Sequence, residues 1–148
     1  MRSWPGHPSR VPAAPSPQPP AADPRQAFGL LGERIAERWL RARGWTVLAR
    51  RFRSGHRDLD LVVRQGRQVA FVEVKARRDG RFGDPGGAVG WRKRRELTRS
   101  AQAWIDRCGR AGDAYRFDVV AVLVGPAGVR VRHVADAFRA HAGGRGAG

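Results

Sequence analysis

The stretch FVEVKARRD, residues 71–79, decides how the rest of the chain is interpreted. Its apolar residues are typical of a core strand, yet Glu73 and Lys75 lie among them. Strand side chains alternate between two faces, so Glu73 and Lys75 point the same way. Opposite charges on one face indicate either a solvated pair on a half-exposed strand or a functional site. The neighbouring sequence has to separate these two interpretations.

The preceding strand, DLDLVVR at residues 58–64, also carries acids. Alternation puts Asp58 and Asp60 on one face and Leu59, Leu61 and Val63 on the other. The short RQGRQ segment between the strands predicts that they are antiparallel neighbours. Such pairing brings Asp60 near Glu73, although the sequence does not fix the register. We therefore expect three carboxylates and one ammonium group to converge on one patch of sheet.

A cluster of this kind has a chemical use. Mg²⁺ prefers oxygen ligands and is held by one or two carboxylates plus waters. A bound cation lets two close carboxylates stay ionised, lowers the pKa of bound water and stabilises charge on a phosphoryl group. A nearby lysine can orient or deprotonate that water, or neutralise developing charge. Asp, Glu and Lys on adjacent strands therefore indicate a site for phosphodiester hydrolysis.

The remaining elements predict an α/β fold. Apolar spacing favours helices over residues 28–44 and 91–109, and strands over 45–53, 58–64, 68–77, 115–125 and 128–134. Three strands in a meander, followed by a crossover helix and a further strand, make a mixed central sheet flanked by helices. We expect a disordered Pro-rich extension over residues 1–26, a single domain over 27–140 and a flexible tail over 141–148.

The composition favours a polyanionic partner. Lysine and arginine number 29 against 13 acids, which gives a formal net charge of +16. Nucleic acid is the simplest partner for such a surplus. Cys108 is the only cysteine, which excludes an intrachain disulfide and a cysteine-rich zinc site. With no apolar run of membrane-spanning length and no signal-like apolar segment, we expect a cytoplasmic protein without a membrane partner.

Several longer motifs carry a resemblance to a known family. They are GLLGERIAERWL (29–40), RRFRSGHRDLDLVV (50–63), VAFVEVKARRDGRFGDP (69–85), KRRELTRSAQAWI (93–105) and RFDVVAV (116–122). Together they resemble the PD-(D/E)xK nuclease superfamily. More closely they resemble the YraN-like family of bacterial proteins, which is similar to Holliday-junction resolvases and restriction-type endonucleases. The resemblance implies a restriction-endonuclease-like αβββαβ core.

The resemblance also implies roles for single residues. Asp60 matches the metal-binding Asp of the superfamily, and Glu73 with Lys75 matches its ExK pair. Glu33 matches a helical Glu that many members add to the site. The expected catalytic set is therefore Asp60, Glu73, Lys75 and Glu33, with Mg²⁺ or Mn²⁺ as cofactor. An acid early in a helix is also favoured by the helix dipole, so Glu33 alone does not decide between ligand and helix-start acid.

One position departs from the family pattern. The family has GExDL where this chain has Arg57-Asp58-Leu59-Asp60-Leu61, so arginine replaces glycine and Asp replaces Glu. The shorter acid still offers oxygen ligands, and the arginine changes the turn. The expected metal ligands are Asp60, Glu73, Glu33 and Asp58.

Basic residues flank the proposed site on both sides. The expected nucleic-acid-binding residues are Arg50, Arg53, Arg57, Arg77, Arg78, Lys93 and Arg94. Phosphate contacts of this kind give salt-dependent, sequence-independent binding. Trp91 either stacks on an exposed base or belongs to the core or a helix staple. No recognition-helix pattern is present, so we expect selection of DNA, rather than RNA, by structure.

Three further residues have simpler interpretations. Asp118 in YRFDVV is expected to be satisfied structurally, because acids that enter core strands usually are. His56 and His133 lack a matching set of metal partners, so we expect surface or satisfied residues.

Three functions remain open at this point. The first is a metal-dependent endonuclease that hydrolyses DNA phosphodiester bonds, for which a homodimer would suit cleavage of both strands. The second is a non-catalytic nucleic-acid-binding module that keeps the nuclease fold. The third is an interaction protein whose Pro-rich N-terminus docks on a partner. Metal-dependent cleavage separates the first from the others.

Overall fold

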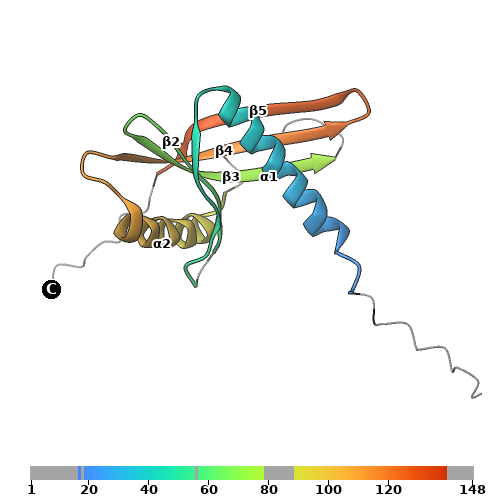
Figure 1. Cartoon of the computed structure of the whole chain (residues 1–148), viewed down its shortest axis with the longest axis horizontal. Helices are drawn as coiled ribbons and strands as arrows, with labels where there is room; N and C mark the ends of the chain where they lie inside the picture. Colours follow the sequence, from blue (N-terminus) through green and yellow to red (C-terminus); the bar gives the residue numbers. More distant parts are fainter. Residues whose placement is uncertain (1–16, 18, 56, 79–88, 140–148) are drawn as a thin grey trace, which may run out of the picture.

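The computed structural model describes residues 17, 19–55, 57–78 and 89–139. The elements are α1 (Pro24–Ala42), β1 (Thr46–Phe52), β2 (Leu59–Gln65), β3 (Gln68–Arg78), α2 (Trp91–Cys108), β4 (Ala114–Gly125) and β5 (Gly128–Phe138) (Figure 1). This order is the predicted one, and the α/β class is confirmed. Several parts of the chain lie outside the described residues. They are most of the predicted Pro-rich extension, His56, most of the Gly-rich stretch at residues 79–90, and the predicted tail.

The five strands form one mixed sheet in the order β1-β2-β3-β4-β5. The β1–β2, β2–β3 and β4–β5 pairs are antiparallel, and β3–β4 is parallel. Because parallel neighbours need a long crossover, α2 connects the end of β3 to the start of β4. This arrangement is compatible with the restriction-endonuclease-like core expected from the sequence.

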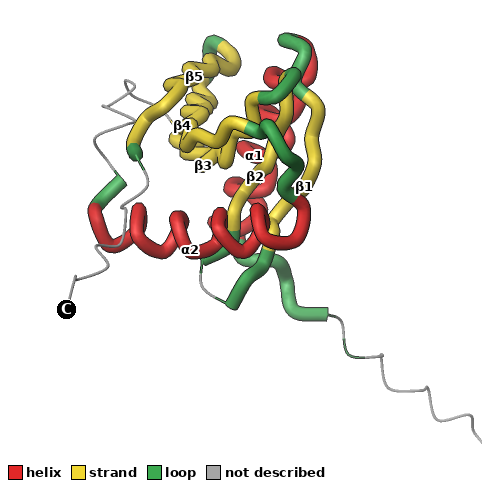
Figure 2. Tube along the Cα trace, turned by 90° about the vertical axis from the view of Figure 1, so that its left-hand side faces the viewer, coloured by secondary structure: helices red, strands yellow, loops and turns green. Residues whose placement is uncertain are grey.

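The two helices cover opposite faces of the sheet (Figure 2). On one face, Ala36 and Leu40 of α1 pack with Val72 and Val120. On the other face, α2 buries its apolar stripe against the strands in a cluster that includes Leu97, Trp104, Phe71 and Val119. Phe71 and Val72 are adjacent in β3, so the alternation of side chains along the strand puts one of them in each core.

Helix α1 begins earlier than the apolar pattern predicts. It starts at Pro24, whereas the periodic apolar residues start at Phe28. Asp23 is the N-cap, and its carboxylate accepts a hydrogen bond from the Arg25 amide at 3.0 Å. Proline at the first helical position after an acidic cap is a known helix start. The signal was therefore present in the sequence, within the stretch assigned to the extension.

The same helix approaches the sheet closely at one point. Gly32 is buried, and a Cβ at this position would lie 2.6 Å from the Ala76 Cβ of β3. The adjacent Glu33 is thereby held near the sheet. On the described residues, no helix is long and apolar enough to span a membrane.

One strand departs from the alternation expected from the sequence, and another is longer than predicted. Leu59 was expected on the face of Leu61 and Val63, but it packs with Val62 in the cluster below α2. The reason is that β2 is paired with β3 only as far as Leu61, so the strand is free to turn beyond it. Strand β5 is longer than predicted and runs to Phe138.

Candidate active site

The candidate site lies where β2 and β3 separate. The ladder between these strands ends at the Leu61–Val72 pair, and the next residues in register are Asp60 and Glu73. There the Asp60 carboxylate takes the place of a backbone partner, since its Oδ2 accepts a hydrogen bond from the Val74 amide at 2.8 Å. The predicted approach of Asp60 to Glu73 is therefore present, and the fork between two strands produces it.

Glu73 is the more deeply buried of the two acids. Its residue is 9% exposed, which is low for a charged side chain. Lys93, from the first turn of α2, donates a short hydrogen bond from Nζ to Glu73 Oε1. The sequence interpretation put Lys93 on a phosphate, whereas the structure puts it on the acid of the ExK pair. Lys93 thus fixes the orientation of Glu73.

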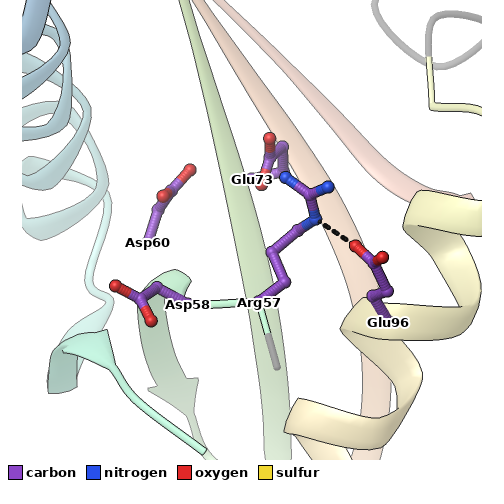
Figure 3. A pocket seen from close by; sticks show the side chains of 5 residues that line it. All are labelled: Arg57, Asp58, Asp60, Glu73 and Glu96. Carbon is purple, nitrogen blue, oxygen red and sulfur yellow. Dashed lines mark hydrogen bonds and ion pairs between the residues drawn. The ribbon is translucent and has the colours of Figure 1, made fainter. Parts of the chain in front are cut away.

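The two acids open onto a pocket of about 580 Å³ (Figure 3). Its described lining consists of Arg57, Asp58, Asp60, Glu73 and Glu96. Arg57 projects along the pocket, and its Nε donates a hydrogen bond to Glu96 Oε2 at 2.8 Å (Figure 3). Arg57 therefore adds a cation to the lining of a pocket that otherwise consists of carboxylates.

The carboxyl of Asp60 is electrostatically unusual. Burial and the adjacent charge of Glu73 raise its pKa to about 7, although the hydrogen bond from the Val74 amide acts in the opposite direction. Glu33 adds a smaller upward contribution to the pKa. Strongly perturbed carboxyl groups in an open pocket are typical of functional sites. A cation between the two acids would relieve the repulsion that raises this pKa.

Glu33 lies near the site but already has a partner. Its carboxylate accepts two hydrogen bonds from Arg51, at 3.0 and 3.3 Å. Arg51 stands opposite Asp60 in β1, between the pairs Arg50–Leu61 and Phe52–Leu59. Its φ of 46° is a left-handed conformation that non-glycine residues rarely adopt. Such a backbone next to a perturbed acid is the kind of strain that accumulates at functional sites.

The four expected metal ligands are not all brought together. Asp58 lines the pocket, but its carboxylate pairs with Arg53 at 3.6 Å, and Glu33 is held by Arg51. Among the described residues, no group of three or more His, Cys, Asp or Glu side chains is placed to hold a metal ion. Asp60 and Glu73 alone remain as a close pair, which suffices for Mg²⁺ completed by waters.

Lys75 is half-buried and lies in register with Ala121 of β4. Alternation along β3 puts it on the same face as Glu73, as expected. The described lining of the pocket does not include Lys75. It lies two residues beyond Glu73 along β3, on the far side of Glu73 from the β2–β3 turn.

Six of the seven basic residues expected to bind nucleic acid have a partner within the protein. Within the described residues, Arg50 forms two bonds to Glu37, Arg53 pairs with Asp58, Arg57 with Glu96, and Lys93 with Glu73. Arg78 lies over the Phe28 ring, and Arg94 donates to the Val89 carbonyl. Arg77 is exposed. Most of these cations thus have an internal partner, which a phosphate would have to replace.

Sequence reasoning missed two residues that shape the site. Glu96 lines the pocket from α2, and Arg51 bridges α1 and β1. Arg57 and Glu96 are 39 residues apart, and Arg51 and Glu33 are 18 apart. No local pattern connects such pairs, although three-residue spacing puts Glu96 one turn after Lys93 on the same helix face.

Asp118 forms a second buried acidic centre, on the other side of the sheet. It is 0% exposed and accepts hydrogen bonds from Arg116, from His133 Nε2 at 2.7 Å and from the Asp136 amide at 2.9 Å. Burial raises the pKa of Asp118, but these donors outweigh it and the net pKa is lowered. The expectation that Asp118 and His133 are structurally satisfied is confirmed.

Comparison with known proteins adds a family relationship. The family model described as "Uncharacterised protein family UPF0102" matches residues 32–122. A UPF0102 protein of Anaeromyxobacter dehalogenans is 42% identical over 116 residues, which cover 78% of this chain and 87% of the relative. One from Symbiobacterium thermophilum is 44% identical over 115 residues, covering 76% and 96%. One from Beutenbergia cavernae is 44% identical over 111 residues, covering 74% and 94%.

Proposed function

The chain belongs to the UPF0102 family, the YraN-like family expected from its motifs, and from its site we propose that it is a metal-dependent endonuclease acting on DNA. The observation that carries the proposal is the Asp60–Glu73 pair at the fork of β2 and β3, facing an open pocket. Two adjacent buried carboxylates without a shared proton are unfavourable unless a cation joins them. A divalent cation fits this requirement better than a purely structural role does.

Each residue of the site has a role in this proposal. Asp60 and Glu73 would hold Mg²⁺ or Mn²⁺, which when bound would activate a water and stabilise charge on the phosphate. The Val74 amide and Lys93 orient the two carboxylates. Lys75, beyond Glu73 on β3, is the candidate to orient the attacking water or to neutralise negative charge that develops on the phosphate.

The remaining predicted ligands have supporting roles. Glu33 and Asp58 would become ligands only if they left Arg51 and Arg53. In the arrangement seen, Glu33 instead adds negative potential at Asp60. We therefore assign the metal to Asp60 and Glu73, with Glu33 acting through the field at Asp60 and Asp58 contributing to the pocket lining.

Arg57 is suited to contact the scissile phosphate. Its guanidinium projects over the pocket and is held by one hydrogen bond to Glu96, whose side chain is 35% exposed. Exposed ion pairs are weak, so a phosphate could replace Glu96 at little cost. The +16 charge of the chain would hold DNA by salt-dependent contacts without base readout, which favours selection by DNA structure.

The test is a cleavage assay on labelled single strand, duplex, flap and four-way junction, in Mg²⁺, Mn²⁺ or EDTA. We expect cleavage that requires metal and falls more than about 100-fold in Asp60→Asn, because even outer-shell changes at metal sites cost about 10–100-fold. Asp106→Asn is the matched control, since Asp106 is an exposed acid on α2 bonded to Gln102. Equal cleavage by the wild type and Asp60→Asn would refute the site.

A second function is supported by a specific observation. Lys93 already pairs with Glu73, and Arg57 adds a second cation to the pocket lining, so the acids are partly compensated without a metal. This favours a non-catalytic DNA-binding module. It would bind the same DNAs in a salt-dependent way and leave every substrate intact with either metal.

A further inference from the structure

A row of exposed residues on α2 lies beside the pocket and is not used by the proposed chemistry. It consists of Trp91, Arg95 and Arg99, spaced four residues apart, together with Arg92. Side chains at this spacing share one face of a helix. All four are exposed, and Trp91, at 63%, is the most exposed of the large hydrophobic residues in the described part of the chain.

The row adjoins the wall of the pocket. Lys93, Glu96 and Ser100 form the helix stripe that faces the site, through bonds to Glu73, Arg57 Nε and the Arg57 carbonyl. Glu96 has Arg92 four residues before it and Arg99 three residues after it, so their Cβ atoms lie about 5–6 Å from its own. A strand leaving the pocket past Glu96 would therefore meet these arginines directly.

The fold does not explain these side chains. None of the three arginines has a hydrogen bond or ion pair with a described residue, in contrast to Arg50, Arg51 and Arg57. The ring of Trp91 likewise has no aromatic or cationic partner among them. An exposed tryptophan beside arginines that have no partner in the described part of the chain, on a helix whose core stripe is elsewhere, indicates a binding surface.

We propose that the Trp91–Arg95–Arg99 row binds an unpaired DNA strand that continues out of the pocket. This rests on the proposed nuclease function and names its substrate class: DNA with a single-stranded segment next to the bond that is cut. Trp91 stacks on one base, and the arginines contact the backbone phosphates. Aromatic stacking with cationic contacts is the usual way in which proteins hold single strands.

The geometry favours an unpaired strand over a duplex. A base can stack on Trp91 only if one of its faces is free, and inside a duplex both faces are covered by neighbouring bases. The row rises about 12 Å from Trp91 to Arg99, at 1.5 Å per residue, which accommodates a few nucleotides. Asp106, held by Gln102, lies beyond Arg99 toward the C-terminal end of α2 and limits the row there.

Binding can be measured without any cleavage. Fluorescence anisotropy of the full chain in EDTA would compare a labelled thymidine oligonucleotide with a blunt hairpin duplex over a range of salt. We expect Trp91→Ala to weaken binding of the single strand roughly 5- to 150-fold, with little effect on the duplex. Trp91→Phe should restore most of the affinity, because its ring still stacks.

The arginines have a matched control on α1. Arg34 and Arg38 are also exposed and four residues apart, but they lie on the helix that covers the other face. We expect the Arg95→Ala/Arg99→Ala variant to flatten the slope of log K against log salt by about 1.4 on the single strand, since each phosphate contact contributes about 0.7. Arg34→Ala/Arg38→Ala should leave the slope unchanged.

Two results would overturn the proposal. One is wild-type affinity of Trp91→Ala for the single strand, and the other is equal flattening of the slope in both arginine pairs. Because EDTA is present throughout, these results do not depend on catalysis. If no DNA were cleaved with either metal while Trp91→Ala lost single-strand binding, the nuclease assignment would fail and this surface would stand.

Discussion

Two buried acids in this protein have opposite electrostatic surroundings. Asp118 is fully buried and its pKa is lowered, because Arg116, His133 and a backbone amide all donate to it. Asp60 is less buried, yet burial and the charge of Glu73 raise its pKa to about 7. Burial therefore does not decide the direction of the shift, since the partners do. The acid with a complete set of donors is satisfied within the fold, whereas the acid beside another acid retains a repulsion that a bound cation would relieve.

The largest expected difference in stability concerns Asp118. Asp118→Asn removes the charge that Arg116 and His133 face, and we expect it to lower the free energy of unfolding by about 3 kcal/mol, as when one partner of a buried pair is lost. Urea denaturation at neutral pH measures this. Asp60→Asn, the same substitution at the other acid, should cost little or stabilise the protein because it removes a like-charge repulsion. Equal losses in both variants would contradict the comparison.

The pH dependence of stability should also separate the two acids. Asp60 has a pKa of about 7 in the folded protein against 3.8 for an ordinary aspartate, so the native state binds more protons between these values. The free energy of unfolding should therefore fall as pH rises from about 4 to 7, by at most about 1.4 kcal/mol per unit. The contribution of Asp118, whose pKa is lowered, is complete above pH 4 and is lost only at lower pH.

Denaturation curves from pH 4.5 to 8 test this. The fall in the free energy of unfolding with rising pH should disappear in Asp60→Asn and persist in Asp118→Asn. A slope that persisted in Asp60→Asn would show that another group causes it.

Helix α1 carries residues close to both acidic centres and allows a finer test. It carries Glu33 near Asp60, and its Trp39 ring packs edge-on against His133 at 5.7 Å. Gly32→Ala would put a methyl group 2.6 Å from the Ala76 Cβ, and we expect a loss of about 1–3 kcal/mol in the free energy of unfolding from overpacking. Thermal or urea unfolding measures it.

Gly29 on the same helix is the control. A Cβ at Gly29 would meet nothing within 4 Å, so Gly29→Ala should stabilise the protein by about 0.5–1 kcal/mol through helix propensity. A neutral Gly32→Ala would mean that α1 can move off β3 freely. It would then not hold Glu33 in place.

The smallest expected effect concerns the counter-charge of Glu73. Lys93→Met leaves Glu73 without its ammonium partner, so the negative charge next to Asp60 is less compensated. The pKa of Asp60 should rise further, and the fall in stability with pH should extend to higher pH. Arg95→Met on the same helix, whose side chain points to solvent, should leave the profile unchanged. A profile that moved to lower pH in Lys93→Met would contradict this role.

The sequence predicted the element order and the closeness of Asp60 and Glu73, because a short turn leaves two strands few ways to pair. It did not predict that the ladder stops one residue before the acids, since this depends on the Asp60 side chain bonding to the Val74 amide. The sequence also did not predict the role of Arg51, because a pattern of apolar residues does not indicate which arginine adopts a left-handed backbone conformation. Long-range ion pairs form only once tertiary packing brings their members together.

The hydrogen bond from the Val74 amide to Asp60 allows the ionisation of Asp60 to be followed by NMR. The chemical shift of an amide proton responds to the charge on its acceptor, so the Val74 resonance should titrate with Asp60. A diamagnetic Mg²⁺ titration would move the same resonance without any labelled substrate. The fork that assembles the site thus also supplies an atom whose resonance reports on Asp60.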